Sequence, residues 1–381
     1  MTVRQQFTPD LIDDLLTLRQ TLHQHPELSN HEHQTQQTLV AELKKCNAVD
    51  IITPGTSVVA RIKGQDESLP PVAIRGDIDA LPIQEATGLP YASKNDGVMH
   101  ACGHDVHATW AIGAARLLAQ APAKRDVIII LQQAEELATG AKFLLDEGAL
   151  PSSIAAIFGA HVDRRYAVGQ VVHHDGAIST YSDKFYFTVT GKSAHAARPK
   201  EGINPIPEAA NLSTAIIDAT TPLTNHTNLI TITQVHGGSA HNIIPATVEV
   251  SGTIRCLDSS KRDAIKAALA SLQGQRNGCE VTLRIDSASP AVLNDASLST
   301  IAKNAIGMAV GNDGAVPLVA PNMASEDFGY YAHQFPGWFF RVGARLENEP
   351  FIPVHTPEFI AHDDAIFVGA AVLANAARLV G

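Results

Sequence analysis

The sequence is short of cysteine, of basic side chains and of long apolar runs, and each shortage argues against a class of protein. Its four cysteines are scattered along 381 residues, at positions 46, 102, 256 and 279. This spacing disfavours a disulfide framework and suits a reducing compartment. No stretch of about 18 apolar residues occurs, so we expect no transmembrane helix. Residues 1–7 contain no apolar signal core, and we therefore expect a cytoplasmic protein.

The shortage of basic residues restricts the partners. Lys and Arg total 28 against 39 Asp and Glu, which gives a formal net charge of −11. Such an acidic chain is a poor candidate for binding nucleic acid or an anionic membrane surface. Local arginines can still bind a small anionic substrate. The length allows two domains with cores of their own.

Apolar patterning predicts an α/β fold whose catalytic domain has a mostly parallel sheet flanked by helices. Residues 9–25 carry leucines at helical spacing. Ser29 and Glu32 have the spacing of a capping box at the start of a second helix. The continuous apolar run at 126–131 is typical of a parallel strand that is buried on both faces. Residues 155–159 form another apolar strand.

The pattern changes near residue 182. Between residues 183 and 290 the expected elements follow the order βαββαβ, which is typical of an α+β ferredoxin-like domain. The α/β pattern resumes at about residue 291. We therefore expect a discontinuous catalytic domain of residues 1–182 and 291–381, with an inserted domain at 183–290.

Polar side chains gather where the expected strands end. The run at 100–107 holds three histidines, one cysteine and one aspartate, which are ligand types of a divalent-metal site. Loops at strand ends are where open α/β sheets place ligands. Within this run, His107 is expected to support the site rather than bind metal. Asp77 and Asp79 alternate after a strand and can face one site, although a solvated turn explains their spacing equally well.

Two adjacent carboxylates, Glu135 and Glu136, follow the strand at 126–131. On an extended chain they would point apart and take different roles. A helix N-terminus, where acidic side chains are favoured, is the plainer explanation. His161 follows the strand at 155–159, and a single histidine there is more often structural than a ligand.

Taken together, eight runs resemble the M20-type metallopeptidases and amidohydrolases, in the branch of aminoacylases, hippurate hydrolases and indoleacetyl-amino-acid hydrolases. They occur in the order of that family and cover nearly the whole chain. The runs are residues 22–28, 75–82, 100–107, 134–136, 191–195, 242–245, 325–328 and 355–359.

The resemblance implies two divalent metal ions, and zinc, manganese, cobalt and nickel all suit the donor types. It implies Glu135 as the general base and His195 of the inserted domain as a donor to the oxyanion, often across a homodimer. Asp77 and Asp79 would orient metal-bound imidazoles. Glu326 lies in an acidic motif of the family without an assigned role. The implied metal ligands are Cys102, His104, Glu136, His161 and His355.

The implied reaction cleaves the amide of an N-acyl amino acid into a carboxylic acid and a free amino acid. A metal-bound water attacks while Glu135 acts as base. Two alternatives stay open: a dipeptidase or aminopeptidase of the same superfamily, and a catalytically silent metal-binding protein. The intact Glu135 argues against the second, because a silent site needs no base.

Some positions depart from the family pattern without touching an implied ligand. Gln133 stands where members often have proline, and the segment after His161 lacks a common proline. Arg164 and Arg165 could alter the substrate rim, which puts the substrate preference in doubt. Arg255 has two open interpretations, a substrate-carboxylate ligand and a structural strand arginine.

Overall fold

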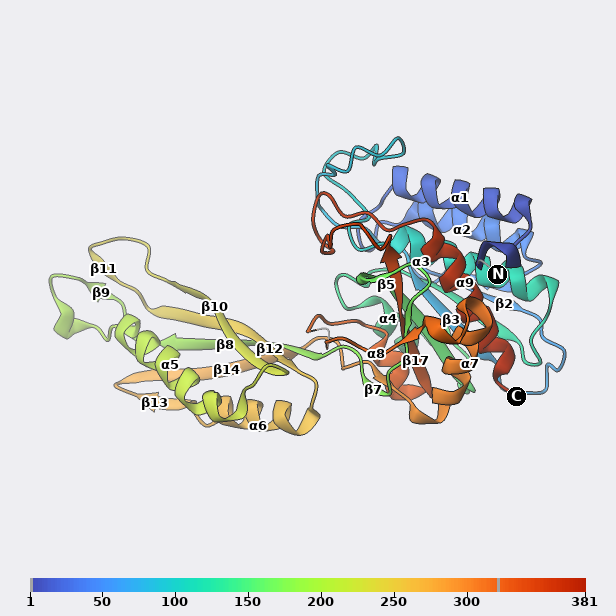
Figure 1. Ribbon diagram of the computed structural model, residues 1–381. Coiled ribbons are helices and arrows are strands. Elements are labelled where there is room, and N and C mark those ends of the chain that lie inside the picture. The colour runs from blue at the N-terminus through green and yellow to red at the C-terminus, as the bar shows by residue number, and fades with distance from the viewer. Residues whose placement is uncertain (1–2, 321–322) are drawn as a thin grey trace. The chain divides into compact units, whose positions relative to one another are not determined.

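The computed structural model describes residues 3–320 and 323–381 (Figure 1), and the chain divides into two compact units. The first comprises Met1–Ile178, Val292–Ala320 and Asp327–Gly381. The second comprises Ser179–Ala291 and Pro321–Glu326. The domain boundaries expected from the sequence stay predictions, and they include positions 1–2 and 321–322, which lie outside the described residues.

The first unit is built on an eight-stranded sheet with the order β1-β2-β4-β3-β5-β17-β6-β16. Its centre is parallel: β3 pairs with β4 and β5, and β5 pairs with β17. The pairs β1–β2 and β2–β4 are antiparallel. The predicted mostly parallel sheet is therefore confirmed. The strands are β1 (Val49–Ile52), β2 (Val58–Ile62), β3 (Val72–Asp77), β4 (Val127–Gln132), β5 (Ala156–Ala167), β6 (Val171–Val172), β16 (Ala315–Val316) and β17 (Gly337–Arg345).

Helices cover both faces of this sheet, and β4 shows why its sequence is apolar throughout. Val127, Ile129 and Leu131 pack into one hydrophobic core, whereas Ile128 and Ile130 pack into another. Alternate residues of a strand face opposite sides, so a strand covered on both sides must be apolar at every position. The helices of the first unit are α1 (Pro9–Gln24), α2 (His33–Lys45), α3 (His104–Gln120), α4 (Gly140–Asp146), α7 (Ser299–Val310), α8 (Gly329–Gln334) and α9 (Asp364–Leu379).

Helix α2 begins without the expected capping box. Glu32 occupies the cap position, but its side chain makes no capping hydrogen bond. The carboxylate of Glu27 accepts the backbone N–H groups of Gln34 at 3.1 Å and Thr35 at 2.9 Å instead. The predicted capping role of Ser29 and Glu32 is therefore wrong, because a carboxylate earlier in the chain reaches the free N–H groups of the first turn.

The second unit has the predicted ferredoxin-like order of elements. Its main sheet has the strand order β10-β12-β8-β14-β13, and all of its pairs are antiparallel. A short ladder joins β9 (Ala194–His195) to β11 (Ile243–Ile244). The other elements are β8 (Tyr181–Thr190), α5 (Pro205–Thr220), β10 (Asn228–Gly237), β12 (Thr247–Cys256), α6 (Ser259–Ala270), β13 (Gly274–Arg276) and β14 (Cys279–Ser287).

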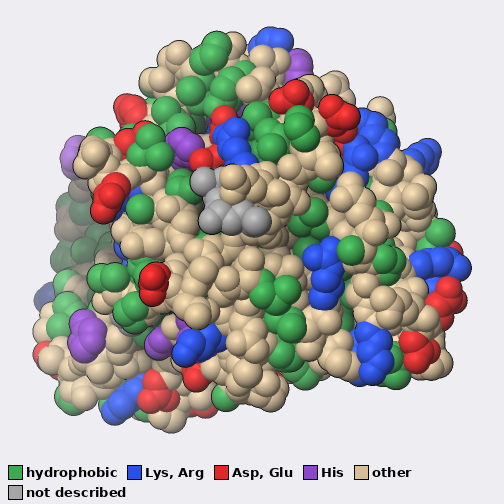
Figure 2. All heavy atoms as spheres, turned by 45° about the vertical axis from the view of Figure 1, so that its right-hand side comes forward, with side chains coloured by type: hydrophobic (Ala, Val, Ile, Leu, Met, Phe, Trp, Pro, Cys, Tyr) green, Lys and Arg blue, Asp and Glu red, His purple; other side chains and the backbone are tan. Residues whose placement is uncertain are grey.

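Short elements complete the chain. They are the 3₁₀ turns η1 (Val3–Gln6), η2 (Pro199–Glu201), η3 (Thr221–Leu223), η4 (Ala296–Leu298) and η5 (Asn312–Gly314), and the strand pair β7 (Gly176–Ala177) and β15 (Leu293–Asn294). Within the described part of the chain, no helix combines the length and apolarity needed to cross a bilayer. Figure 2 shows acidic and basic side chains interspersed over one face.

Candidate metal centre

The centre lies where β3 and β4 end and beside the middle of β5. The sequence places His161 after a strand that ends at residue 159, but β5 runs from Ala156 to Ala167, so His161 lies within the strand. Cys102 stands in the loop that leads into α3, and His104 is the first residue of that helix. Gly103 between them has φ 89°, and a Cβ there would lie 2.6 Å from the Val162 side chain. Glycine therefore lets the chain turn tightly against β5, so that the thiol and the imidazole reach the same space.

All five implied ligands converge. Cys102 Sγ lies 3.3 Å from His161 Nε2. Glu136 Oε1 lies 3.8 Å from His104 Nε2 and 3.4 Å from His355 Nε2. Ligand atoms within 4.8 Å of one another form the groups Cys102–His104–His161 and Cys102–Glu136–His355. Cys102 belongs to both groups.

Unsatisfied buried atoms indicate that a cation fits between these ligands. His104 Nε2 and Glu136 Oε1 are buried and find no hydrogen-bond partner among the described residues. Such atoms cost about 1–3 kcal/mol each when left unpaired. Burial, followed by the Glu136 carboxylate, raises the pKa of the Cys102 thiol well above its usual value. A bound cation would stabilise the thiolate and satisfy both orphaned atoms.

His161 is presented in the form that a ligand requires. Burial lowers its pKa well below the usual value, so the ring is neutral. Its Nδ1 lies 2.6 Å from the Val162 carbonyl oxygen, to which only a protonated Nδ1 can donate. Nε2 therefore carries the lone pair that faces Cys102.

Asp79 holds His104 and the loop of the two glutamates together. Asp79 Oδ1 accepts from His104 Nδ1 at 3.1 Å, which leaves Nε2 of that imidazole directed at the centre. Asp79 Oδ2 accepts from Ser29 Oγ at 2.7 Å and from the Glu136 backbone N–H at 3.1 Å. Burial would raise the pKa of Asp79, but the hydrogen bond and charge of His104 together with the Ser29 hydrogen bond outweigh it and hold the pKa below its usual value. The sequence predicts Ser29 as part of a helix cap and gives no sign of its contact with Asp79.

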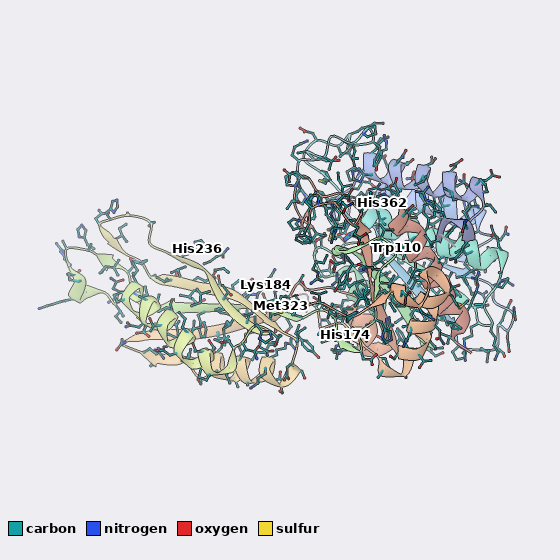
Figure 3. The ribbon with its side chains drawn as sticks, in the orientation of Figure 1. Trp110, His174, Lys184, His236, Met323 and His362 are labelled. Atoms are coloured by element: carbon teal, nitrogen blue, oxygen red, sulfur yellow. The ribbon has the colours of Figure 1, made fainter. Side chains whose placement is uncertain are left out.

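His107 supports the centre and is not free to bind metal. Its Nδ1 donates to Asp77 Oδ1 at 2.6 Å, and its Nε2 accepts the Val162 backbone N–H at 3.0 Å. Its ring stacks on Trp110, labelled in Figure 3, with centroids 4.5 Å apart. Both nitrogens are therefore occupied, and the imidazole links β3 to the segment beside His161.

The two glutamates lie in a turn, and neither explanation of their position from the sequence holds. β4 ends at Gln132 and α4 begins only at Gly140, so they are neither on an extended strand nor at a helix N-terminus. Ala134 and Ala138 have φ of 50° and 56°, values that residues with a Cβ rarely adopt. Glu135 Oε1 accepts the Asp327 backbone N–H at 3.4 Å, whereas Glu136 is directed at the imidazoles. The turn, rather than a strand, gives the two carboxylates different surroundings.

The loop that carries His355 is held by main-chain contacts. The His355 N–H donates to the Ala101 carbonyl at 2.8 Å, and its φ is 64°. Arg164 is buried and donates to the Pro350 and Ile360 carbonyl oxygens of that loop. Arg165 pairs with Asp163. Arg164 also pairs with Glu349 at 3.4 Å, so its guanidinium holds this loop, and the expectation that Arg164 and Arg165 alter the substrate rim stays a prediction.

The remaining predicted residues lie in the second unit. His195 is exposed on β9, and its Nδ1 accepts the Ala197 N–H at 3.1 Å, so its proton is on Nε2. Arg255 lies on β12, where burial lowers its pKa, and its Nη1 has no partner among the described residues. Both interpretations of Arg255 remain open.

Comparison with known proteins relates this arrangement to one family. The model described as Peptidase family M20/M25/M40 matches residues 73–379. The N-acetyl-L-cysteine deacetylase of Bacillus subtilis is 34% identical, with 99% of this chain and 92% of the relative covered. The IAA-amino acid hydrolase ILR1-like 2 of Arabidopsis thaliana is 32% identical, with coverage of 97% and 86%. A solved Bacillus subtilis structure, described as a dinuclear metal binding peptidase from the M20 family, superposes with TM-score 0.82 at 31% identity and covers 98% of this chain and 99% of its own.

Proposed function

The chain belongs to peptidase family M20/M25/M40, a family of hydrolases, and on that premise we propose that it is a metal-dependent amidohydrolase of N-acyl amino acids. The products are a carboxylic acid and a free amino acid. The observation that carries the proposal is the convergence of one thiol, three imidazoles and one carboxylate beside a second carboxylate, Glu135. Relatives named for N-acetylcysteine and for IAA-amino acids support the substrate class.

We assign two divalent ions, of zinc, manganese, cobalt or nickel, to Cys102, His104, Glu136, His161 and His355. When bound, these ions would lower the pKa of a water and polarise the amide carbonyl. The protein supplies the imidazoles, a buried thiol and the contacts that aim them. Asp79 fixes the tautomer of His104 through Nδ1, and the Val162 carbonyl does the same for His161.

Glu135 is the proposed general base. Its carboxylate belongs to a group with His104 and Glu136 whose ligand atoms lie within 4.8 Å of one another, so it stands beside the centre while Glu136 occupies the ligand position. It would take a proton from the attacking water and deliver it to the leaving nitrogen. His195 of the second unit is proposed to donate its Nε2–H to the developing oxyanion.

The test is a panel of acetyl-amino acids, longer acyl-amino acids and dipeptides, assayed on metal-stripped enzyme with each of the four metals restored in turn. We expect acyl-amino acids to be cleaved faster than dipeptides and chelation to abolish turnover. Glu135→Gln should bind metal normally but lose about 10²–10⁴-fold in kcat, the usual contribution of a general base. Near-wild-type turnover by Glu135→Gln with metal bound would refute the assignment, and faster turnover of dipeptides would favour a peptidase.

A further inference from the structure

The segment between α1 and α2 contacts the loop of the two glutamates directly through two side chains and indirectly through a third. We name residues 133–138, which include Glu135 and Glu136, the glutamate turn. Glu32 Oε1 accepts the Ala134 backbone N–H at 3.0 Å. Asn30 Oδ1 accepts from Gln133 Nε2 at 2.8 Å. Ser29 acts through Asp79, which accepts the Glu136 N–H. Gln133 and Ala134 are thus bonded to residues about a hundred positions earlier, and Glu136 is bonded to Asp79.

Burying the Glu32 side chain at this position costs free energy. Its side chain is fully buried, and a buried carboxylate is costly unless hydrogen bonds satisfy it. Two donors do so: the Ala134 N–H on Oε1 and the Thr56 hydroxyl on Oε2. It does not cap α2, whose first turn is capped by Glu27. Its contacts are therefore made with Ala134 of the glutamate turn and with Thr56.

The hydrogen bond between the Ala134 N–H and Glu32 lies at the kink of the glutamate turn. Ala134 is the residue directly before Glu135, and it adopts φ 50°, a conformation that a side chain disfavours. Gln133 on the other side is clamped, since its Oε1 accepts the Ser57 N–H at 3.1 Å and its own N–H donates to Ser57 Oγ at 3.1 Å. A kink of this kind persists only where its surroundings hold it.

We propose that Glu32 is a positioning residue, which holds the left-handed kink at Ala134 and thereby aims Glu135 at the substrate while Glu136 faces the metal ligands. The inference rests on the proposed function of Glu135. Misplacement of a catalytic group by a fraction of an ångström reduces the chemical step more than substrate binding. The effect of losing Glu32 should therefore be seen in kcat.

Glu32→Gln tests this at constant size. The carboxamide oxygen can still accept from the Ala134 N–H while its NH₂ group donates to the Thr56 hydroxyl, so the Ala134 N–H exchanges an ionised acceptor for a weaker neutral one. We expect kcat to fall about tenfold or more, as for the exchange of a hydrogen bond to a charged group for a neutral one, with KM within about twofold. Metal content, measured by mass spectrometry, should be unchanged.

Glu27→Gln is the matched control. It removes the same charge from the same segment, but Glu27 caps α2 and its side chain has no hydrogen bond to the glutamate turn among the described residues. We expect a lower melting temperature and a kcat within twofold of wild type. If Glu32 had a merely structural role, both variants would lower the melting temperature and neither would change kcat, and that outcome would overturn the proposal.

Hydrogen–deuterium exchange gives a readout that does not depend on activity. Peptides that span the glutamate turn should exchange faster in Glu32→Gln than in wild type, because the Ala134 N–H then has a weaker, neutral acceptor, and Glu27→Gln should leave them unchanged. Unchanged exchange in Glu32→Gln would contradict the inference. If wild type cleaves no acyl-amino acid, the proposed function fails, while the exchange result still decides whether Glu32 holds the kink.

Should Glu32→Gln fail to fold, Asn30→Gly replaces it. Asn30 is exposed and has φ 66°, so glycine suits its backbone, and the change removes only the acceptor of Gln133. We expect a kcat about threefold lower together with faster exchange of the turn. Wild-type kcat and exchange in this variant would overturn the proposal.

Discussion

Asp79→Asn should weaken metal binding although Asp79 is not itself a proposed ligand. The carboxylate accepts three hydrogen bonds, from His104 Nδ1, from Ser29 Oγ and from the Glu136 backbone N–H. An asparagine has one acceptor oxygen and one NH₂ group. If the NH₂ group faces His104, Nδ1 must become an acceptor and the proton moves to Nε2, which blocks the ligand atom. If the NH₂ group instead faces Ser29 and Glu136, the Glu136 N–H loses its acceptor.

Either orientation costs one hydrogen bond to a charged group in a fully buried site, which is worth about 1.5–3 kcal/mol. That range corresponds to a loss of roughly 10–100-fold in metal affinity, the size usually seen when the partner of a metal-bound imidazole is removed. The assay is competition with a chromophoric chelator, performed on apo-enzyme with zinc and with manganese, and far-UV circular dichroism verifies the fold.

Asp183→Asn is a suitable control for Asp79→Asn. Asp183 is also a fully buried carboxylate, paired with Arg262 and Lys266, but it lies in the second unit on β8. Its replacement should destabilise the protein and leave metal affinity within twofold. Wild-type affinity in Asp79→Asn, or an equal loss in both variants, would refute the view that Asp79 orients His104 toward a metal.

Two further predictions concern the same unit. Cys102→Ala removes a donor from both ligand groups, so the bound metal measured by mass spectrometry should fall, and turnover should fall by more than about a hundredfold. The melting temperature of the apo-protein should change little. Full metal content and activity in this variant would make the thiol an inert buried group. Burial alone would lower the pKa of His23, but the Asp105 carboxylate outweighs it and raises the pKa to about 9. Because this folded pKa lies above the unfolded value of about 6.5, the stabilisation is complete below about pH 6.5 and is lost as the pH rises through 9, up to roughly 3 kcal/mol. Urea denaturation at pH 6, 7.5 and 9 should show the decline in wild type and a flatter profile in His23→Gln, and parallel profiles would contradict it.

Local patterns were sufficient for the elements and for the chemistry of the site. The apolar run at 126–131 predicts β4, and the order βαββαβ predicts the second unit, because periodicity depends only on neighbouring residues. The ligand types could also be read from the chain, since a thiol, imidazoles and carboxylates at strand ends are the donors of a metal site. The prediction of which donors come together rested on the family resemblance, because spacing along the chain does not give it.

Local reasoning failed where a side chain had a distant partner. Ser29 and Glu32 have the spacing of a capping box, yet their partners are Asp79 and Ala134. The position of Arg164 after His161 gives no sign of its partners, which are carbonyl oxygens almost two hundred residues later. A polar side chain near two possible partners takes the one that burial makes most costly to leave unpaired, and burial is not visible in a short window.

The sequence by itself determined the main helices and strands of both units and the donor types of the candidate centre. Only the tertiary structure decided their geometry. The parallel register that sets Asp77 against Gln132 and Arg75 against Gly159 brings the ends of β3 and β4 beside the middle of β5. Side chains separated by 59 residues, such as Cys102 and His161, then lie 3.3 Å apart. Register is a property of paired strands rather than of either strand alone, and for that reason the centre and the turn that aims its glutamates appear only in the folded chain.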